Sequence, residues 1–186
     1  MPIASLVRRP MLPPARRLKR ALFFVYHRAF VSGSKIAFGE KNNYQVNPTF
    51  TTIDVDNADI CMDFNSFPVL PFADASVDVV FSSRALMHLT ENQVTMFLSE
   101  TLRILRPGGK LLIQLPDLQI EEDKLSGAHN STWYPSKFNM ALKKTGFAVI
   151  EGTNRTSIPS FLFRGGFRPS YSFRAIAVKG GVGQHE

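Results

Sequence analysis

The stretch from Ser76 to Pro116 constrains the fold of this chain more than any other part. It contains two short runs of β-branched and aliphatic residues, at 77–81 and 111–115, that are typical of strands buried on both faces. Pro107-Gly108-Gly109 is predicted to end the intervening helix, with a glycine at the positive φ of a C-terminal cap. Two buried strands joined by a helix predict a right-handed βαβ unit. The helix itself is predicted from apolar side chains at three- and four-residue spacing: Val94, Phe97, Leu98, Thr101, Leu102 and Leu105.

Positive charge is concentrated in the N-terminal part of the chain. Residues 1–30 contain seven of the 22 Lys and Arg residues and no Asp or Glu, whereas residues 31–186 carry 15 basic and 15 acidic side chains. A neutral remainder argues against a broad nucleic-acid-binding face on the domain itself. A length of 186 residues with 44% hydrophobic residues is typical of one globular domain. We therefore expect a basic arm or helix over residues 1–34, a domain over 35–179 and a flexible tail over 180–186.

The arm is predicted to become helical from Ala15 onward. Its roles stay open between a helix packed over a bare face of the domain, an amphipathic helix on an anionic membrane or a protein partner through residues 8–30, an organelle-targeting segment, and an RNA-binding arm. The RNA role is disfavoured, because no aromatic–glycine pattern of an RNA-binding module accompanies it. We expect a cytoplasmic or organellar-matrix protein, peripheral to a membrane or free, and no secretion. The predicted apolar stripe comprises Leu18, Leu22, Val25 and Ala29.

Cysteine and histidine usage excludes several kinds of site. Cys61 is the single cysteine, which excludes an internal disulfide and a cysteine-based zinc cluster; we expect it to be a buried small hydrophobe in a reducing compartment. No metal site is expected, and the nicotinamide-dehydrogenase, P-loop and hydrolase glycine motifs are missing from the sequence. The four histidines do not fall at metal-ligand spacings: His27, His88, His129 and His185.

Short strands are predicted at 35–39, 50–55 and 59–64, and the second and third of them end near an acid. In an open parallel sheet the ligand site lies at the carboxyl ends of the strands. Asp54 at such an end can accept hydrogen bonds from both ribose hydroxyls of a nucleoside. Helix capping or an Asx-turn is the structural alternative for Asp54.

The C-terminal half is predicted to hold a helix from Pro135 to Thr145, capped by Gly146, and two strands at 147–150 and 173–178. The loop before this helix contains three weak candidates for substrate contact, which ordinary surface loops also carry: His129, Trp133 and Tyr134. Between the last strands, aromatic residues alternate with arginines, as in base-stacking surfaces, protein contacts or a hydrophobic cluster under a loop.

Four tracts together resemble the class I S-adenosylmethionine-dependent methyltransferases, and the likeness extends from about Lys35 to Val178. The resemblance implies an α/β Rossmann-like sandwich: a seven-stranded, mostly parallel sheet with an antiparallel last strand, here with reduced helices between the first strands. It implies S-adenosylmethionine as cofactor. The tracts are Ile53-Asp54-Val55, Asp59 to Phe64, LPFADASVDVVFSSRALMHL and LRILRPGGKLLIQLP.

The same resemblance implies roles for individual residues. Gly39 would lie beside the methionine part of the cofactor, Asp54 would hold the ribose, and Asp63 would contact the adenine. Glu40 would meet the ammonium group of the cofactor. The remaining implied contacts are Phe64 against the adenine ring and Ser82 near the sulfonium. His88, after the fourth strand, is the candidate general base, or else a histidine that ties helix to loop.

The glycine-rich loop departs from the family pattern. The family has two or three glycines after the first strand, whereas this chain has Gly39-Glu40-Lys41-Asn42-Asn43. We predict methyl transfer to an O or N nucleophile of an unidentified acceptor. The alternative is a catalytically inactive, methyltransferase-like structural or regulatory subunit of a larger assembly, mitochondrial or membrane-associated.

Overall fold

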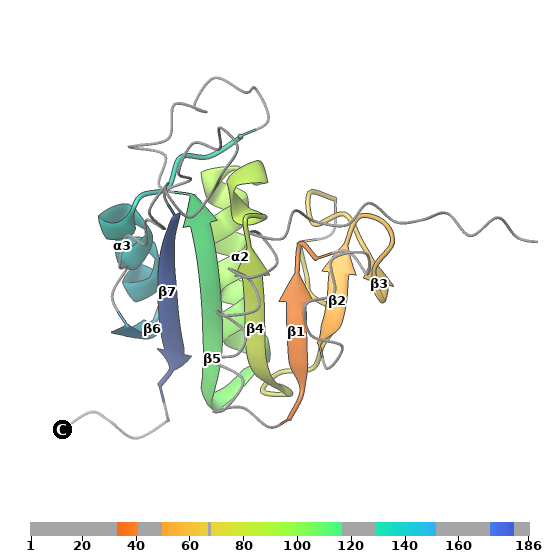
Figure 1. The fold of residues 1–186 in the computed structure, drawn as a ribbon. Helices are drawn as coiled ribbons and strands as arrows, with labels where there is room; N and C mark the ends of the chain where they lie inside the picture. Colours follow the sequence, from red (N-terminus) through yellow and green to blue (C-terminus); the bar gives the residue numbers. More distant parts are fainter. Residues whose placement is uncertain (1–32, 41–49, 67, 117–128, 152–171, 181–186) are drawn as a thin grey trace, which may run out of the picture.

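In the computed structural model, residues 33–40, 50–66, 68–116, 129–151 and 172–180 are described. They form one seven-stranded sheet in the order β3-β2-β1-β4-β5-β7-β6 (Figure 1). β7 is antiparallel to both of its neighbours, so the other six strands are parallel to one another. The predicted sheet is therefore confirmed. Its strands are β1 Lys35–Phe38, β2 Thr51–Asp54, β3 Ile60–Cys61, β4 Val77–Ser83, β5 Leu105–Pro116, β6 Phe147–Glu151 and β7 Ser172–Lys179.

Helix α2, Glu91–Ile104, crosses from β4 to β5 as the spacing of apolar residues predicts. Its first turn is closed by a capping box, in which the Thr90 hydroxyl accepts from the Gln93 N–H at 3.3 Å and the Gln93 Oε1 accepts from the Thr90 N–H at 2.8 Å. This pairing satisfies two N–H groups that a helix start otherwise leaves without partners. The side chains buried along α2 are Val94, Phe97, Leu98, Thr101 and Ile104.

The predicted role of the Pro-Gly-Gly sequence as the cap of α2 is wrong. The helix ends earlier, at Ile104, because Leu105 is already extended and pairs with Val77 of β4. The next pair joins Val79 to Lys110, so residues 107–109 form an irregularity within β5. Gly108 does adopt a positive φ of 78°, but in this bulge and not at the helix end.

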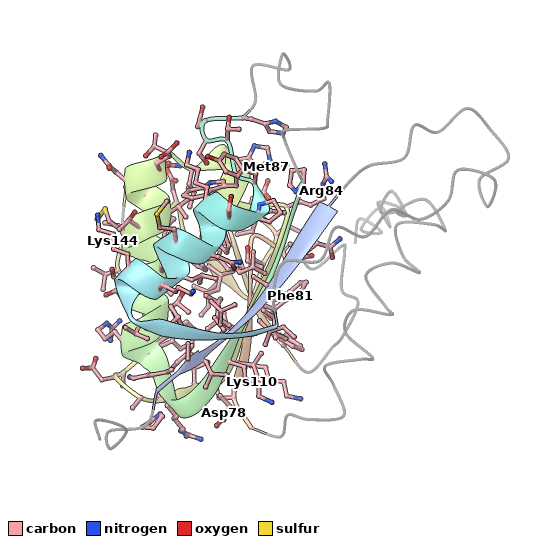
Figure 2. All side chains as sticks on the ribbon, turned by 90° about the vertical axis from the view of Figure 1, so that its left-hand side faces the viewer. Asp78, Phe81, Arg84, Met87, Lys110 and Lys144 are labelled. Carbon is pink, nitrogen blue, oxygen red and sulfur yellow. The ribbon has the colours of Figure 1, made fainter. Side chains whose placement is uncertain are left out.

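Helix α3, Pro135–Thr145, has the predicted boundaries. Proline opens it and Gly146 closes it at φ 106°, with its N–H directed to the carbonyls of Leu142 and Lys143. α2 and α3 lie on the same side of the sheet (Figure 2). Both helices contribute side chains to the main core between helices and sheet, where the rings of Phe38 and Phe97 lie 4.5 Å apart.

A second, smaller hydrophobic cluster lies on the opposite face of the sheet, which we call the second face. Strand side chains alternate between faces, so Ile36 and Phe38 join the main core while Ala37 between them points to the second face. In Figure 2, Phe81 lies on the side away from the two helices. The second face consists of Ala37, Phe50, Val79, Phe81, Leu112 and Ile176.

The return from β2 to β3 is unusually short for parallel strands, which ordinarily need a dozen or more connecting residues. The Asp59 carboxylate accepts from both the N–H and the hydroxyl of Thr52, at 2.9 and 3.0 Å. The Asp59 N–H donates back to the Thr52 hydroxyl at 2.9 Å. These side-chain bonds hold the tight return, after which β3 is only two residues long. Its Cys61 is exposed, so the prediction of a buried cysteine is wrong, because a short edge strand covers little.

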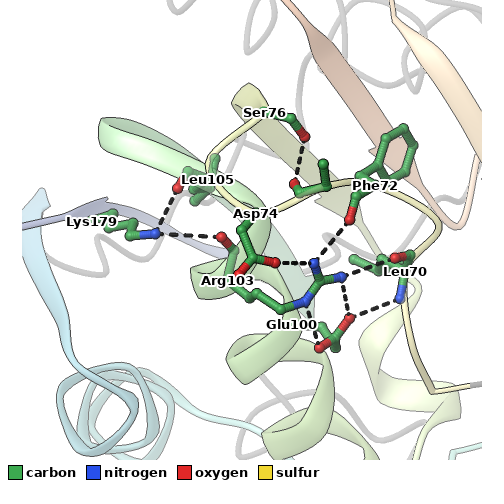
Figure 3. A network of polar contacts seen from close by, with 9 residues as sticks. Leu70, Phe72, Asp74, Ser76, Glu100, Arg103, Leu105 and Lys179 are labelled. Carbon is green, nitrogen blue, oxygen red and sulfur yellow. Dashed lines mark hydrogen bonds and ion pairs between the residues drawn. The ribbon is translucent and has the colours of Figure 1, made fainter.

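A network around Arg103 holds the segment that enters β4 (Figure 3). The Arg103 guanidinium donates to both carboxylate oxygens of Glu100 at 3.0 and 2.8 Å, and to the carbonyls of Phe72 and Leu70 at 2.9 and 3.0 Å. It also forms an ion pair with Asp74 at 2.6 Å. The Arg103 pKa is raised by these carboxylates, and the Glu100 pKa is lowered, mainly by Arg103. Two side chains of α2 thus fix a segment that forms no helix or strand of its own.

Several predicted elements lie outside the described residues. These are the basic arm up to residue 32, most of the glycine-poor loop, the aromatic–arginine connection at 152–171 and the tail from 181. Within the part of the chain that the structure describes, no helix has the length and apolar character needed to cross a membrane.

Candidate functional site at the carboxyl edge of the sheet

The sheet register brings the ends of three strands to one level. Phe38, the last residue of β1, pairs with Ile53 of β2 on one side and with Ser82 of β4 on the other. Gly39, Asp54 and Ser82 therefore lie at the same edge of the sheet, on neighbouring strands spaced about 4.8 Å apart. The register of the strands thus brings Gly39, Asp54 and Ser82 to the carboxyl edge of the sheet.

Gly39 is required at its position for two reasons internal to the protein. Its φ is 72°, and a Cβ added there would lie 2.0 Å from the Ala85 Cβ, which belongs to the turn after β4. Its N–H donates to the Ile53 carbonyl at 2.7 Å. The space that a side chain would fill is therefore taken by protein, and the single glycine serves the close approach of β1 and β4. Glu40 follows with only 5% of its surface exposed.

Asp54 ends β2 with a half-buried side chain. Its Oδ1 accepts from the N–H of the next residue, Val55, at 2.7 Å. An Asx-turn would engage an N–H two residues on, whereas the bond shown goes to the next residue; a helix cap would require a helix, whereas β3 is the next described element. The carboxylate retains acceptor capacity toward a ligand at this edge.

Asp63 and Phe64, both predicted to contact adenine, make hydrogen bonds and ring contacts within the protein itself. Asp63 lies in the turn after β3, where its carboxylate accepts from the N–H and the side-chain amide of Asn65 at 2.9 and 2.8 Å and from Ser66 at 3.2 Å. The Asn65 N–H is the main reason that the Asp63 pKa is lowered. Phe64 is 3% exposed, and its ring meets those of Phe38 and Phe97 edge-on at 5.4 and 5.9 Å. Their adenine contact stays a prediction.

Two buried hydroxyls lie at the end of β4. Ser82 and Ser83 are 1% and 3% exposed, and neither Oγ has a hydrogen-bond partner among the described residues. Buried polar groups are nearly always hydrogen-bonded, so this pair is an unusual feature for a strand end. Ser83 was not singled out from the sequence, and the repeated serine at 82–83 is the signal that could have found it.

Arg84 follows these serines, and the sequence did not predict it as a site residue either. Its φ of 58° is left-handed, which is uncommon for a residue with a side chain, and its N–H donates to the Gln114 carbonyl at 2.8 Å. Figure 2 shows Arg84 at the carboxyl end of the sheet, near Met87. No local pattern in the sequence marks this conformation, because it depends on the neighbouring strand β5.

His88, the candidate base, is exposed at the end of a short 3-10 helix, η2, Leu86–His88. Its ring centroid lies 5.6 Å from that of His129, a candidate from a segment 41 residues later. Asn130 holds the two segments together, since its N–H donates to the Met87 carbonyl at 2.9 Å and its side-chain amide to the His88 carbonyl at 2.7 Å. The structure therefore brings these two histidines together.

Trp133 and Tyr134, the other two acceptor-side candidates, lie differently. Trp133 is 3% exposed, donates its indole N–H to the Ser131 hydroxyl at 2.7 Å and packs edge-on against Phe138 at 5.4 Å. Tyr134 is half-buried as the residue before α3. The described residues contain no group of three or more metal-ligating side chains.

The donors and acceptors at this edge fit a nucleoside cofactor in part. Asp54 supplies a carboxylate for ribose hydroxyls, and Ser82 and Ser83, two strands away on β4, carry unpartnered hydroxyls on opposite faces of the sheet. Gly39 supplies no cradle, because Ala85 fills the space above it. Residues 41–49, which complete the loop after β1, lie outside the described part of the chain.

Comparison with known proteins agrees with this geometry. Residues 34–113 match the family described as a methyltransferase domain. The chain is 30% identical over 128 residues to the O-methyltransferase resE of Aspergillus sclerotiorum, covering 62% of this chain and 44% of that protein. It is 46% identical over 48 residues to a protein of Mycolicibacterium smegmatis named "Probable S-adenosylmethionine-dependent methyltransferase", covering 26% of this chain and 18% of that one. The chain thus spans less than half of either curated relative.

Solved structures share the fold at low sequence identity. A SAM-dependent methyltransferase of Archaeoglobus fulgidus superposes with a TM-score of 0.68 at 11% identity, covering 88% of this chain and 94% of that one. A chain from the complex of the Trm112 methyltransferase activator of Haloferax volcanii gives 0.63 at 17% identity, covering 90% and 95%. Residues 34–113 therefore match a methyltransferase domain, and the chain shares the fold of solved S-adenosylmethionine-dependent methyltransferases.

Proposed function

We propose that the chain binds S-adenosylmethionine at the carboxyl edge of β1, β2 and β4 and transfers its methyl group to an O or N nucleophile. The observation that carries this proposal is the alignment of Asp54 with the unpartnered hydroxyls of Ser82 and Ser83 at one edge of the sheet. A buried hydroxyl without a partner costs free energy unless a ligand or solvent completes its hydrogen bonds. The family match over residues 34–113 supports the same cofactor.

On the cofactor side, Asp54 accepts hydrogen bonds from the two ribose hydroxyls, and Glu40 meets the ammonium group. Ser82 lies between β1 and β5 at the level of Phe38, on the side of the sulfonium. The sulfonium supplies a methyl group that is already activated for displacement. The protein therefore contributes chiefly position, holding donor and acceptor in line.

On the acceptor side, His88 accepts the proton that an alcohol or amine loses on methylation. The ring of His129 lies beside it at 5.6 Å, and Asn130 keeps the two segments joined. His88→Ala is expected to lower kcat by about 100-fold, the usual scale for loss of a general base, with little change in cofactor binding. An unchanged kcat would reassign His88 to a structural role.

The test of cofactor binding is isothermal titration with S-adenosylhomocysteine. We expect a dissociation constant on the order of 10 µM, raised about 30-fold or more in Asp54→Ala, because two charge-assisted hydrogen bonds are lost. Asp74→Asn is the matched control, since it removes one negative charge at the opposite end of the sheet from a side chain that is 78% exposed. Equal affinity in Asp54→Ala and Asp74→Asn would place the ribose elsewhere.

An inactive, methyltransferase-like subunit is the second candidate function, and one observation favours it. The space above Gly39 is filled by Ala85, so the glycine is explained without any ligand. A fold neighbour from Haloferax volcanii was solved with a methyltransferase activator, which supports a protein partner for this chain as well. The basic residues between 8 and 30 offer a surface for such a partner or for an anionic membrane. No binding heat at millimolar S-adenosylhomocysteine would favour this subunit role over the enzyme.

A further inference from the structure

The second face of the sheet is an apolar surface with a regular layout. Ala37, Phe81, Leu112 and Ile176 lie directly opposite one another on β1, β4, β5 and β7, forming one row across four strands. All four are between 0 and 8% exposed. Yet α2 and α3 both lie on the other side, and no helix of the described residues covers this one (Figure 2). An apolar row of this width needs an occupant.

The row nearer the amino edge of the same face carries two cations. Lys35 and Lys110 are the register partners of Val79 on either side. The Lys35 ammonium lies 5.9 Å from the centre of the Phe50 ring, and Figure 2 shows Lys110 low on this side of the sheet. The occupant of the second face must therefore meet apolar side chains in the middle and positive charge at the amino edge.

The chain itself enters at this amino edge. The Ser34 N–H donates to the Asp78 carboxylate at 2.7 Å, and the Asp78 N–H donates back to the Ser34 carbonyl at 2.9 Å. Arg106 holds the same carboxylate at 3.0 Å. Residue 34 is thus fixed beside the starts of β1 and β4, the strands in the middle of the sheet. The chain before residue 34 therefore joins the sheet at the amino edge of the second face.

We propose that residues 15–29 form a helix that lies across the second face, antiparallel to β1, with Leu18, Leu22, Val25 and Ala29 turned toward the sheet. Fifteen helical residues span about 22 Å, and the seven residues of β4 span about 23 Å. Residues 30–33 make the turn between helix and strand. The stripe of four apolar residues would run along the strands and cross the apolar row, which shares its apolar character.

The charges agree with this direction of the helix. Running antiparallel to β1, the helix ends at the amino edge, where its C-terminal carbonyls meet Lys35 and Lys110; cations stabilise that end of a helix. The opposite side of the helix, with Arg16 and Arg20, then faces solvent. The basic surface stays available to an anionic partner, while the apolar stripe is used within the chain.

Two other stretches of the chain fit the second face less well. Residues 41–49 contain few apolar side chains. Residues 152–171 join β6 to β7, and since β7 is antiparallel to β6, both ends of that connection lie at the carboxyl edge. Residues 152–171 do not end beside Lys35, whereas residues 41–49 lead into Phe50 next to Lys35 and fit less well only because they contain few apolar side chains.

The test is the accessibility of a thiol placed on the second face. In the full-length chain, Cys61→Ser removes the exposed natural thiol, and Val79→Cys puts a thiol at a position that is 1% exposed. Maleimide labelling of this thiol is then compared between Leu22→Asp, within the stripe, and Arg20→Asp, which introduces the same side chain on the opposite side of the helix. Circular dichroism checks folding, and Leu22→Ala replaces Leu22→Asp if that variant does not fold.

We expect Leu22→Asp to speed labelling about tenfold or more, because a buried carboxylate drives the helix off the face, and Arg20→Asp to change it less than about twofold. With Leu22→Ala the expected increase is about threefold. Equal labelling rates in Leu22→Asp and Arg20→Asp would overturn the proposal. Protection of the thiol from labelling that is lost with Phe161→Asp but not with Leu22→Asp would also overturn it, because residues 152–171 would then cover the second face. Protection that depends on protein concentration would overturn it as well, because a second copy of the chain would then cover that face.

Discussion

The β4–α2–β5 unit and the first three strands reach the same sheet by different means. In the first, a helix of 14 residues crosses between strands and buries five side chains, so burial of apolar area dominates. In the second, β2 returns to β3 through a short segment held by the Thr52–Asp59 bonds, and no described helix intervenes. The β4–α2–β5 unit is held by a repeating pattern of buried apolar side chains. The first three strands are held by a few individual hydrogen bonds. The candidate cofactor contacts lie mostly on the second region.

The largest expected effect comes from Phe97→Ala, which breaks the contact between the two regions. Phe97 of α2 is fully buried and meets the rings of Phe38 on β1 and Phe64 after β3. Deleting this ring should lower the free energy of unfolding by about 4 kcal/mol, measured by urea denaturation. The loss should also weaken S-adenosylhomocysteine binding, because β1 and the turn after β3 are displaced. Unchanged binding in a destabilised protein would show that the regions are independent.

Arg103→Ala is expected to cost about 2–3 kcal/mol of unfolding free energy, because Glu100 and two carbonyls lose a charged donor. Arg103→Lys should recover little, since an ammonium cannot reproduce the planar fork. Arg106→Ala is the control, because its pair with Asp78 has a half-exposed guanidinium and should cost about 0.5 kcal/mol or less. Equal losses of unfolding free energy in Arg103→Ala and Arg106→Ala would contradict the proposal that the Arg103 network stabilises the segment before β4.

Asp59→Ala tests the tight return of the first region. Its loss should cost about 1–2 kcal/mol, because the Thr52 N–H and hydroxyl lose their acceptor. Hydrogen exchange should rise at the β3 amides and stay unchanged in β5. A uniform rise throughout the sheet would mean that the first strands are not a separate weak region. Asp56→Ala, an exposed acid of the same connection, serves as the control.

The smallest expected effect concerns pH. The Glu100 pKa is lowered in the folded protein, chiefly by Arg103. The unfolded chain therefore binds this proton more readily, so the stabilisation is present above the unfolded pKa of about 4.3 and is lost as pH falls through the folded pKa. Wild-type protein should lose more stability between about pH 5 and pH 3 than Glu100→Gln does. Thermal unfolding at several pH values measures this, and identical slopes would contradict it.

Local signals in the sequence predicted the helical region well. The bounds of α3 follow from Pro135 and Gly146, which act within one turn of the helix. The predicted end of α2 is wrong, because the extended conformation of Leu105 is set by pairing with Val77 on another strand. Cys61 was expected to be buried, yet the length of an edge strand depends on its neighbour and not on its own composition.

From the sequence, only those site residues could be predicted that lie at the carboxyl ends of the parallel strands. Asp54 and Ser82 lie at one edge because parallel strands end together. The approach of His88 and His129 could not be read from the sequence, because it arises from backbone bonds between distant segments. Ser83 and Arg84 were missed for a related reason, since burial and a left-handed φ come from packing against β5.

The antiparallel direction of β7 has a practical consequence for attaching other molecules. β1 begins at the amino edge of the sheet, and β7, by reversing, also ends there, as the opposite directions of their arrows in Figure 1 show. Chain that continues before residue 33 or after residue 180 leaves from the edge opposite Asp54, Ser82 and His88. A fluorophore, surface tether or fused protein attached after residue 180 would therefore start at the edge opposite the candidate site, whereas the proposed helix would return residue 15 to the carboxyl edge.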